Sequence, residues 1–136
     1  MSILIQNGTL LCPDGPIRAD LRVAGDRIAE IGVSLPGRDS RIIDAAGKLV
    51  FPGFIDTHTH FEMNKGLPNE TADDWHSGTL AALAGGTTTV LDFAEPERGC
   101  SLSSALEAWH RRADGRSSCH YSFHMTIKDW DPRIQA

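Results

Sequence analysis

From residue 49 onward, short apolar runs alternate with segments of helical periodicity, and this alternation is the strongest constraint on the fold. Residues 49–55 form a continuous apolar run interrupted only by Pro52-Gly53, the pattern of a strand buried on both faces. Two further strands are expected at residues 87–92 and 119–125. Strands that alternate with helices form a parallel sheet with right-handed crossover connections. This part of the chain is therefore predicted to be α/β.

Two helices are expected between these strands. The first is predicted to have Thr71 as its N-cap and to end at Gly85-Gly86. The second begins at serines and ends at Gly115. The side chains expected on one face of each helix are Trp75, Thr79, Ala82 and Leu83, and then Leu102, Leu106, Trp109 and Ala113. A third strand without a partner would leave an open apolar edge, which favours aggregation, so we expect a chain truncated after about three strands of a longer protein.

The first 50 residues predict four or five short strands and no catalytic cluster. Asn7-Gly8 favours a hairpin turn or a bulge, and residues 20–31 fit a second hairpin. A further strand is expected at residues 41–44. Because a few short strands bury little by themselves, this segment is expected to dock on more of the protein.

Charge and cysteine usage narrow the class of protein. The formal net charge of -5 resides in residues 51–136, which also hold all six histidines, so no basic surface for nucleic acid or anionic lipid is expected. Cys12, Cys100 and Cys119 are too few and too widely spaced for a disulfide framework or a cysteine-based zinc site. Without a signal sequence or an apolar run of roughly 20 residues, the protein is expected in the cytoplasm, with no membrane partner.

The first α/β strand leads into Asp56-Thr57-His58-Thr59-His60. Side chains alternate between the faces of a strand, so Asp56, His58 and His60 are predicted to point the same way. A buried apolar strand has little reason to end in three polar groups unless they meet a charge. His58 and His60 are therefore candidate ligands of one metal ion at the carboxyl end of the strand. Asp56 either orients a histidine as a supporting group or caps a turn.

Other polar and aromatic residues are weaker candidates. His124 is expected to be a hydrogen-bonded interior histidine rather than a ligand, and Asp92 either supports the metal site or forms a turn. Trp75 and Trp109 are expected to pack in the core.

The sequence Phe51-Pro52-Gly53-Phe54-Ile55-Asp56-Thr57-His58-Thr59-His60 resembles the signature that opens the barrel of the amidohydrolase superfamily. Later motifs are most similar to its branch of dihydropyrimidinases and D-hydantoinases. These motifs are Thr71-Ala72-Asp73-Asp74-Trp75, Ala84-Gly85-Gly86-Thr87-Thr88-Thr89, Leu91-Asp92-Phe93, Trp109-His110 and Tyr121-Ser122-Phe123-His124-Met125. The resemblance covers almost the whole chain and is strongest from residue 49.

This resemblance implies a (β/α)8 TIM barrel preceded by a small β-sandwich. Residues 1–50 would be the N-terminal β-sandwich segment, and residues 51–136 the first part of the barrel. It also implies two divalent metal ions, usually Zn2+, bridged by a carbamylated lysine, with His58 and His60 as ligands of one ion. None of Lys48, Lys65 and Lys128 occupies the position of that lysine, so no catalytic residue is expected within this chain.

The function implied is hydrolysis of the ring amide of 5,6-dihydropyrimidines or 5-substituted hydantoins, by a homotetramer when full-length. The loop after the histidines would form a lid over the substrate, to which Met63, Asn64 and Leu67 are assigned, and Phe93 would begin a second lid segment after the second strand. The 136 residues alone are expected to be inactive. Two alternatives stay open: a scaffold protein of the same fold without catalysis, and an enzyme of the allantoinase or dihydroorotase type.

Overall fold

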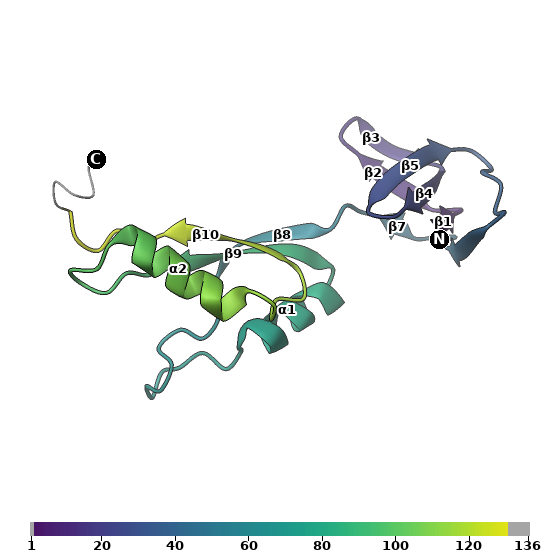
Figure 1. Ribbon diagram of the computed structural model, residues 1–136. Helices are drawn as coiled ribbons and strands as arrows, with labels where there is room; N and C mark the ends of the chain where they lie inside the picture. Colours follow the sequence, from purple (N-terminus) through teal and green to yellow (C-terminus); the bar gives the residue numbers. More distant parts are fainter. Residues whose placement is uncertain (1, 131–136) are drawn as a thin grey trace. The chain divides into compact units, whose positions relative to one another are not determined.

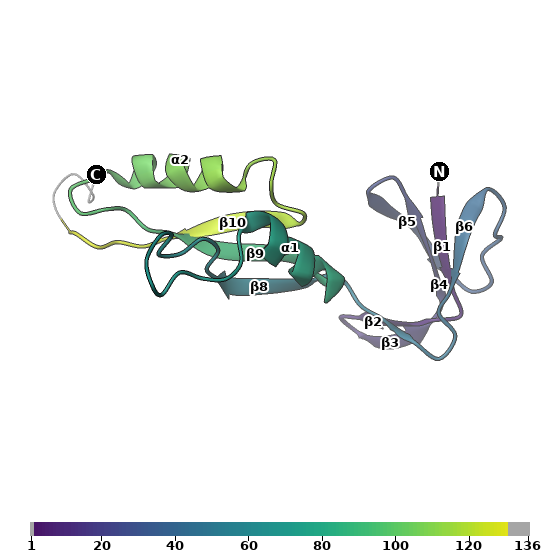
Figure 2. The same cartoon turned by 90° about the horizontal axis from the view of Figure 1, so that it is seen from below.

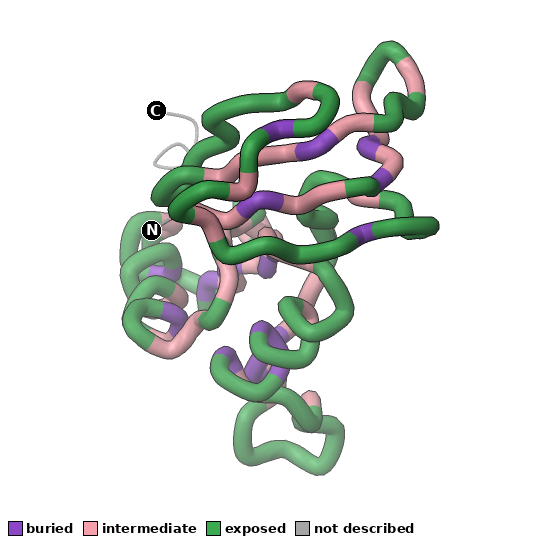
Figure 3. Tube along the Cα trace, turned by 90° about the vertical axis from the view of Figure 1, so that its right-hand side faces the viewer, coloured by how far each residue is buried: buried purple, intermediate pink, exposed green. Residues whose placement is uncertain are grey.

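The computed structural model describes residues 2–130 and separates the chain into two compact units, Met1–Pro52 and Gly53–Ala136 (Figure 1). Exposed stretches make up most of the tube in Figure 3, and buried positions occur in short stretches between them. Within residues 2–130, neither helix is long and apolar enough to cross a membrane.

The described part of the first unit consists of strands arranged in two sheets. The strands are β1 (Ser2–Gln6), β2 (Thr9–Cys12), β3 (Gly15–Arg18), β4 (Asp20–Ala24), β5 (Arg27–Gly32), β6 (Ser40–Asp44) and β7 (Leu49–Val50). One sheet has the order β5-β4-β1-β6 and the other has the order β3-β2-β7. The predicted hairpin of residues 20–31 is confirmed, because β4 and β5 pair antiparallel, with an irregularity between Arg22 and Val23.

The prediction of a hairpin turn at Asn7-Gly8, by contrast, is wrong. β1 pairs with β4 and β6, whereas β2 pairs with β3 and β7, so this dipeptide carries the chain from one sheet into the other. Asn7 adopts a φ of 63°. At Gly8 a Cβ atom would lie 2.8 Å from the side chain of Val50, so the position requires glycine for its close approach to β7.

A buried carboxylate holds this crossing in place. Asp20, at the start of β4, is 7% exposed and accepts hydrogen bonds from the backbone nitrogens of Asn7 at 2.9 Å and Leu35 at 3.0 Å. The apolar residues buried in the same unit are Leu4, Leu10, Leu35 and Ala45. Asp20 therefore fixes both the turn after β1 and the segment that follows β5.

The second unit alternates strands and helices as the sequence predicts. Its elements are β8 (Phe54–Thr59), α1 (Trp75–Ala84), β9 (Thr87–Ala94), α2 (Leu102–Ala113) and β10 (His120–Met125). The three strands pair parallel in the order β10-β9-β8. This confirms the predicted parallel α/β arrangement for the described residues.

The continuous buried strand predicted over residues 49–55 is wrong. Leu49 and Val50 belong to β7 in the first unit, and β8 begins only at Phe54. Proline lacks the N–H group that a strand ladder needs, and a Cβ atom on Gly53 would lie 2.0 Å from the Thr88 side chain. Phe54 and Ile55 are also 53% and 62% exposed rather than buried, since β8 is the edge strand of the sheet β10-β9-β8.

Helix α1 starts later than its predicted cap. Asp74 is the N-cap: its side chain accepts from the Ser77 backbone nitrogen at 2.7 Å, and the Ser77 hydroxyl accepts from the Asp74 nitrogen at 3.1 Å. Thr71 instead accepts a hydrogen bond from the Met63 nitrogen, so its hydroxyl is already used. The end of the helix at Gly85 is confirmed, whereas Leu83 is 41% exposed and does not belong to the buried face.

The bounds of helix α2 agree with the prediction more closely, although Leu106, expected on its buried face, is 38% exposed. Ser101 is its N-cap and the helix ends at Ala113, just before Gly115. The hydroxyl of Tyr121 on β10 donates to the Asp114 carboxylate at the end of the helix. That hydrogen bond raises the pKa of Tyr121 to about 12.

Both helices pack on the same face of the sheet, and Figure 2 shows α2 lying along it. Trp75 of α1 lies 5.4 Å from Tyr121 and 5.7 Å from Phe123 between ring centroids. His110 of α2 approaches the same Phe123 ring at 5.1 Å. Trp75 is fully buried and Trp109 packs at the edge of the same cluster. The predicted core role of both tryptophans is thus confirmed.

We expect Gly78→Ala to destabilise the protein although alanine favours helices. A Cβ atom at Gly78 would lie 2.2 Å from the ring of Phe61, which is itself buried. Alanine gains about 1 kcal/mol in helix propensity, but such overpacking costs about 1–3 kcal/mol. Urea unfolding should show a net loss for Gly78→Ala and no comparable loss for Gly85→Ala, where the nearest atom is an ordinary 3.4 Å away.

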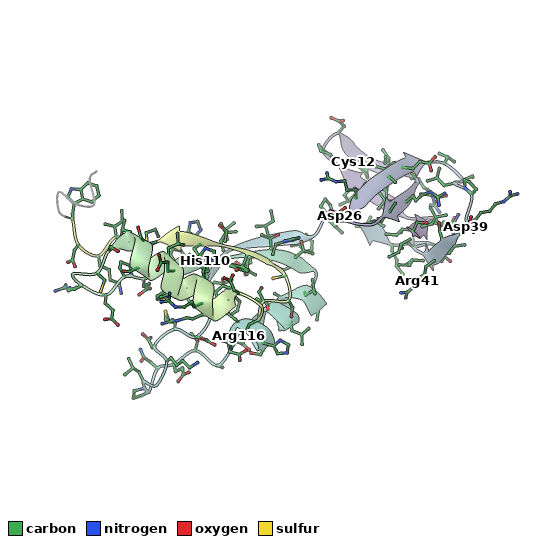
Figure 4. All side chains as sticks on the ribbon, in the orientation of Figure 1. Cys12, Asp26, Asp39, Arg41, His110 and Arg116 are labelled. Atoms are coloured by element: carbon green, nitrogen blue, oxygen red, sulfur yellow. The ribbon has the colours of Figure 1, made fainter. Side chains whose placement is uncertain are left out.

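Asp20→Ala is expected to lower the free energy of unfolding by about 2–4 kcal/mol, since it leaves the buried N–H group of Leu35 and the part-buried N–H group of Asn7 without an acceptor. Asp26→Ala, in the exposed turn between β4 and β5 (labelled in Figure 4), serves as the matched control. Thermal unfolding followed by circular dichroism measures both. Equal melting temperatures for the two variants would show that Asp20 does not hold the crossing.

Candidate metal centre

The candidate centre lies where β8 ends. The register between β8 and β9 shifts between Asp56 and Thr59, so that three residues of β8 advance against two of β9. This irregularity interrupts the strict alternation of faces from which the histidine pair was predicted. Bulges of this kind redirect side chains and are common beside active sites.

The two histidine rings nevertheless meet. Nε2 of His58 lies 3.2 Å from Nε2 of His60, and the ring centroids are 5.1 Å apart with the planes at 79°. Two nitrogen ligands at about 2.0–2.1 Å from one tetrahedral zinc ion lie about 3.3 Å apart. The separation of the two nitrogens thus fits a shared divalent cation, and without a cation one neutral imidazole can donate a hydrogen bond to the other.

Phe93, at the end of β9, supports both rings. Its centroid lies 4.5 Å from that of His58 and 5.0 Å from that of His60, with the His60 ring stacked on it. His124 of β10 packs on the same phenyl ring at 4.9 Å, and its Nε2 donates to the Thr57 carbonyl oxygen at 3.0 Å. Phe93 is thus the apolar wall against which the histidines are oriented.

Asp56 contacts the backbone of the site. Its Oδ1 accepts a hydrogen bond from the His58 backbone nitrogen at 3.1 Å. Of the two roles that its position left open, this contact is the one expected of a turn cap. The carboxylate fixes the backbone that carries His58.

Asp92 shapes this region more than its sequence position indicated. It is 1% exposed; its Oδ2 accepts from the Phe61 nitrogen at 2.8 Å, and its Oδ1 accepts from the Phe93 nitrogen at 2.7 Å. Nε1 of Trp109 also donates to it at 3.3 Å. Burial raises the pKa of the Asp92 carboxyl, while these hydrogen bonds favour its ionised form. Asp92 therefore anchors the residue after His60 and the backbone of Phe93.

One feature of the sequence could have predicted that Asp92 is a buried, hydrogen-bonded carboxylate. An acidic residue that follows Val90-Leu91 and precedes Phe93-Ala94 sits inside an apolar strand. Charged groups rarely occupy such positions unless they are hydrogen-bonded. What the sequence could not reveal was which donors after β8 and on α2 would meet it.

The histidine pair supplies two donors only. Among residues 2–130, no group of three or more His, Cys, Asp or Glu side chains comes together in a way that could hold a metal ion. His76 of α1 and His110 of α2 are exposed, and His120 is exposed at the start of β10. The remaining ligands of any bound cation would therefore be water or groups outside the described residues.

The four residues assigned to a substrate lid line one cavity with His60. The cavity has a volume of about 240 Å³. Met63, Asn64 and Leu67 contribute from the loop after β8, and Phe93 contributes from the end of β9. Lys65, Glu95, Glu97, Trp109, Arg112 and Lys128 are among its other lining residues. The structure thus brings the loop, one histidine and the phenyl wall to a common space.

Comparisons with known proteins identify relatives of this chain. The model of the amidohydrolase family matches residues 49–117. Over 129 residues the chain is 44% identical to a D-hydantoinase of Ralstonia pickettii, and over 138 residues it is 43% identical to a dihydropyrimidinase of Rattus norvegicus. These alignments cover 95% and 98% of this chain but 28% and 26% of the relatives. The chain therefore spans about a quarter of the length of the curated relatives that it matches.

Solved structures give the same relationship. A D-hydantoinase crystal structure superposes on 98% of this chain with a TM-score of 0.91 and 40% identity. A dihydropyrimidinase from Brevibacillus agri superposes with the same TM-score and 37% identity. Each match covers 29% of the solved chain. Together with the family model over residues 49–117, these findings show that the chain belongs to the amidohydrolase family.

Proposed function

We propose that this chain is the N-terminal part of a metal-dependent cyclic amidase. The substrates would be 5,6-dihydropyrimidines or 5-substituted hydantoins, and the products N-carbamoyl amino acids. The observation that carries the proposal is the 3.2 Å separation of the His58 and His60 Nε2 atoms at the end of the first parallel strand. The similarity to proteins named D-hydantoinase and dihydropyrimidinase supports the choice of substrate class.

In this proposal, residues 1–50 form part of a small β-sandwich and residues 51–136 begin a (β/α)8 barrel. Enzymes built on such barrels place their chemistry at the carboxyl ends of the strands, which is where both histidines lie. A carbamylated lysine that bridges two metal ions, and the assembly into a tetramer, would depend on the three-quarters of the relatives' length that this chain does not span.

The residues of this chain would prepare the site for ring opening. A divalent cation held by His58 and His60 would supply a nucleophile at neutral pH and polarise the amide carbonyl. Phe93 holds the two imidazole rings from one side, which limits their rotation. Asp92 fixes the backbone on either side of that contact. The loop with Met63, Asn64 and Leu67 would cover the substituent of the substrate.

Replacing either histidine is expected to remove bound metal from the intact protein. Loss of a supporting group alone weakens metal binding about 10–100-fold, so loss of a ligand should lower the metal content by about one ion per chain. Elemental analysis after gel filtration of His58→Ala and His60→Ala measures this. His120→Ala, which replaces an exposed histidine on β10, is the control. Equal metal contents in all three variants would show that His58 and His60 do not bind the metal.

The intact protein is expected to hydrolyse dihydrouracil or hydantoin in a metal-dependent manner, while the 136-residue chain alone is not. Two imidazoles leave most coordination positions of a zinc ion to water, and the lysine expected to bridge two metals would lie outside this chain. Loss of ultraviolet absorbance of the ring, with and without a chelator, measures turnover. An intact protein that binds metal but opens neither ring would contradict the proposed substrate class.

A further inference from the structure

The loop after β8 is closed at its neck by three backbone-anchored hydrogen bonds. The nitrogen of Met63 donates to the Thr71 hydroxyl at 3.0 Å, and the nitrogen of Thr71 donates to the Met63 carbonyl at 3.1 Å. One step further out, the nitrogen of Glu62 donates to the Asp73 carbonyl at 3.1 Å. A loop whose ends meet in this way is an Ω-loop. Its tip can move only as far as this neck allows.

A single guanidinium joins the two sides of the neck. Nη1 of Arg116 lies 2.6 Å from Oε1 of Glu62, which enters the loop, and Nη2 lies 3.0 Å from Oδ2 of Asp74, which leaves it. Arg116 follows α2, and its backbone nitrogen donates to the Ala113 carbonyl at 3.0 Å. Figure 4 labels Arg116 near the end of α2. A planar guanidinium with several fixed donors suits this bridging role better than the point charge of lysine.

The Glu62 side of the bridge is buried and conformationally unusual. Glu62 is 5% exposed and has a φ of 51°, in the left-handed region that glutamate rarely adopts. Its other cation, Lys65, lies 3.6 Å away, has a side chain that is 63% exposed and belongs to the loop itself. The Arg116 side chain is itself 38% exposed, but without it the buried Glu62 carboxylate would keep only this exposed partner, and a buried charge without a close partner is costly. The neck is therefore the part of the loop that depends most on Arg116.

The neck is adjacent to the candidate centre. Glu62 is two residues from His60, and Met63, Asn64 and Leu67 line the same cavity as His60. A shift at the neck would move these lining residues relative to the histidine. The loop conformation is thus coupled to the shape of the space that would receive a substituent.

We propose that Arg116 is a positioning residue that clamps the neck of the loop, and that it thereby sets which 5-substituents the site admits. The role in substituent selection rests on the proposed function, whereas the clamp concerns the loop alone. The clamp would hold the loop over the cavity for substrates with bulky substituents and matter little for a ring that has none.

Hydrogen exchange followed by mass spectrometry on the intact protein tests the clamp. Arg116→Met should accelerate amide exchange in the peptide covering residues 62–73. It should leave exchange unchanged in the peptides that cover the strands β8, β9 and β10 themselves. Arg111→Met is the matched control, because Arg111 lies on α2, five residues before Arg116, with a side chain that is 71% exposed and pairs only loosely with Glu107 at 3.9 Å. Unchanged exchange in the loop, or faster exchange throughout the protein, would overturn the clamp.

A second variant separates the clamp from general damage. In Arg116→Met combined with Glu62→Gln, no unpaired carboxylate is left buried, so loop exchange should be slower than in Arg116→Met alone. Arg116→Lys should protect the loop less well than the wild type, because it cannot bridge both carboxylates. A double variant that exchanges as fast as Arg116→Met contradicts the role of the Glu62 contact.

Kinetics on the intact protein test whether Arg116 affects the selection of 5-substituents. For Arg116→Met, KM should rise roughly tenfold for a hydantoin with an aryl substituent and change little for dihydrouracil, with kcat on dihydrouracil preserved. An equal loss of activity on both substrates would overturn the role of Arg116 in substituent selection. If the wild type opens neither ring, the proposed function fails, while the exchange measurement still decides whether Arg116 clamps the loop.

Discussion

The arrangement of the second unit depends on the buried carboxylate of Asp92. It sits on the central strand β9 and accepts hydrogen bonds from β9 itself, from the residue after His60 and from Trp109 of α2. A buried carboxylate is tolerated only when donors surround it. Three segments that are distant in sequence are therefore fixed around one side chain. Asp92 thereby also positions the phenyl ring of Phe93 and the ring of His60 that stacks on it.

A second buried carboxylate, that of Glu62, lies at the loop neck. Glu62 is buried like Asp92, but its partner is a guanidinium supplied by the segment after α2. Phe61, which lies between His60 and Glu62 in the sequence, is buried and packs against Trp75 at 5.0 Å. The short stretch from His60 to Glu62 thus joins the candidate metal centre, the aromatic core and the loop that borders the cavity. A change in any of the three is expected to reach the others.

Several features were predictable because they depend on local chemistry. The alternation of strands and helices, the ends of α2 and the end of α1 follow from periodicity and from serine and glycine at helix termini. Features that failed depend on what the chain meets elsewhere. Asn7-Gly8 does not close a hairpin because β1 and β2 find partners in different sheets. Thr71 does not cap α1 because its hydroxyl binds the Met63 nitrogen across the loop.

For the candidate site, the sequence by itself determined the residue types: two histidines one residue apart at the end of a strand, in a run similar to the amidohydrolase family. Tertiary structure alone decided their separation of 3.2 Å, because a bulge in β8 replaced the regular alternation and Phe93 of β9 supplied the surface that orients both rings. It also decided that Asp92 and Arg116 matter, since, apart from the neighbouring Phe93 nitrogen, the donors and carboxylates that they contact lie 17 to 54 residues away along the chain. Contacts of that range are set by packing and cannot be assigned from the spacing of residues in one segment.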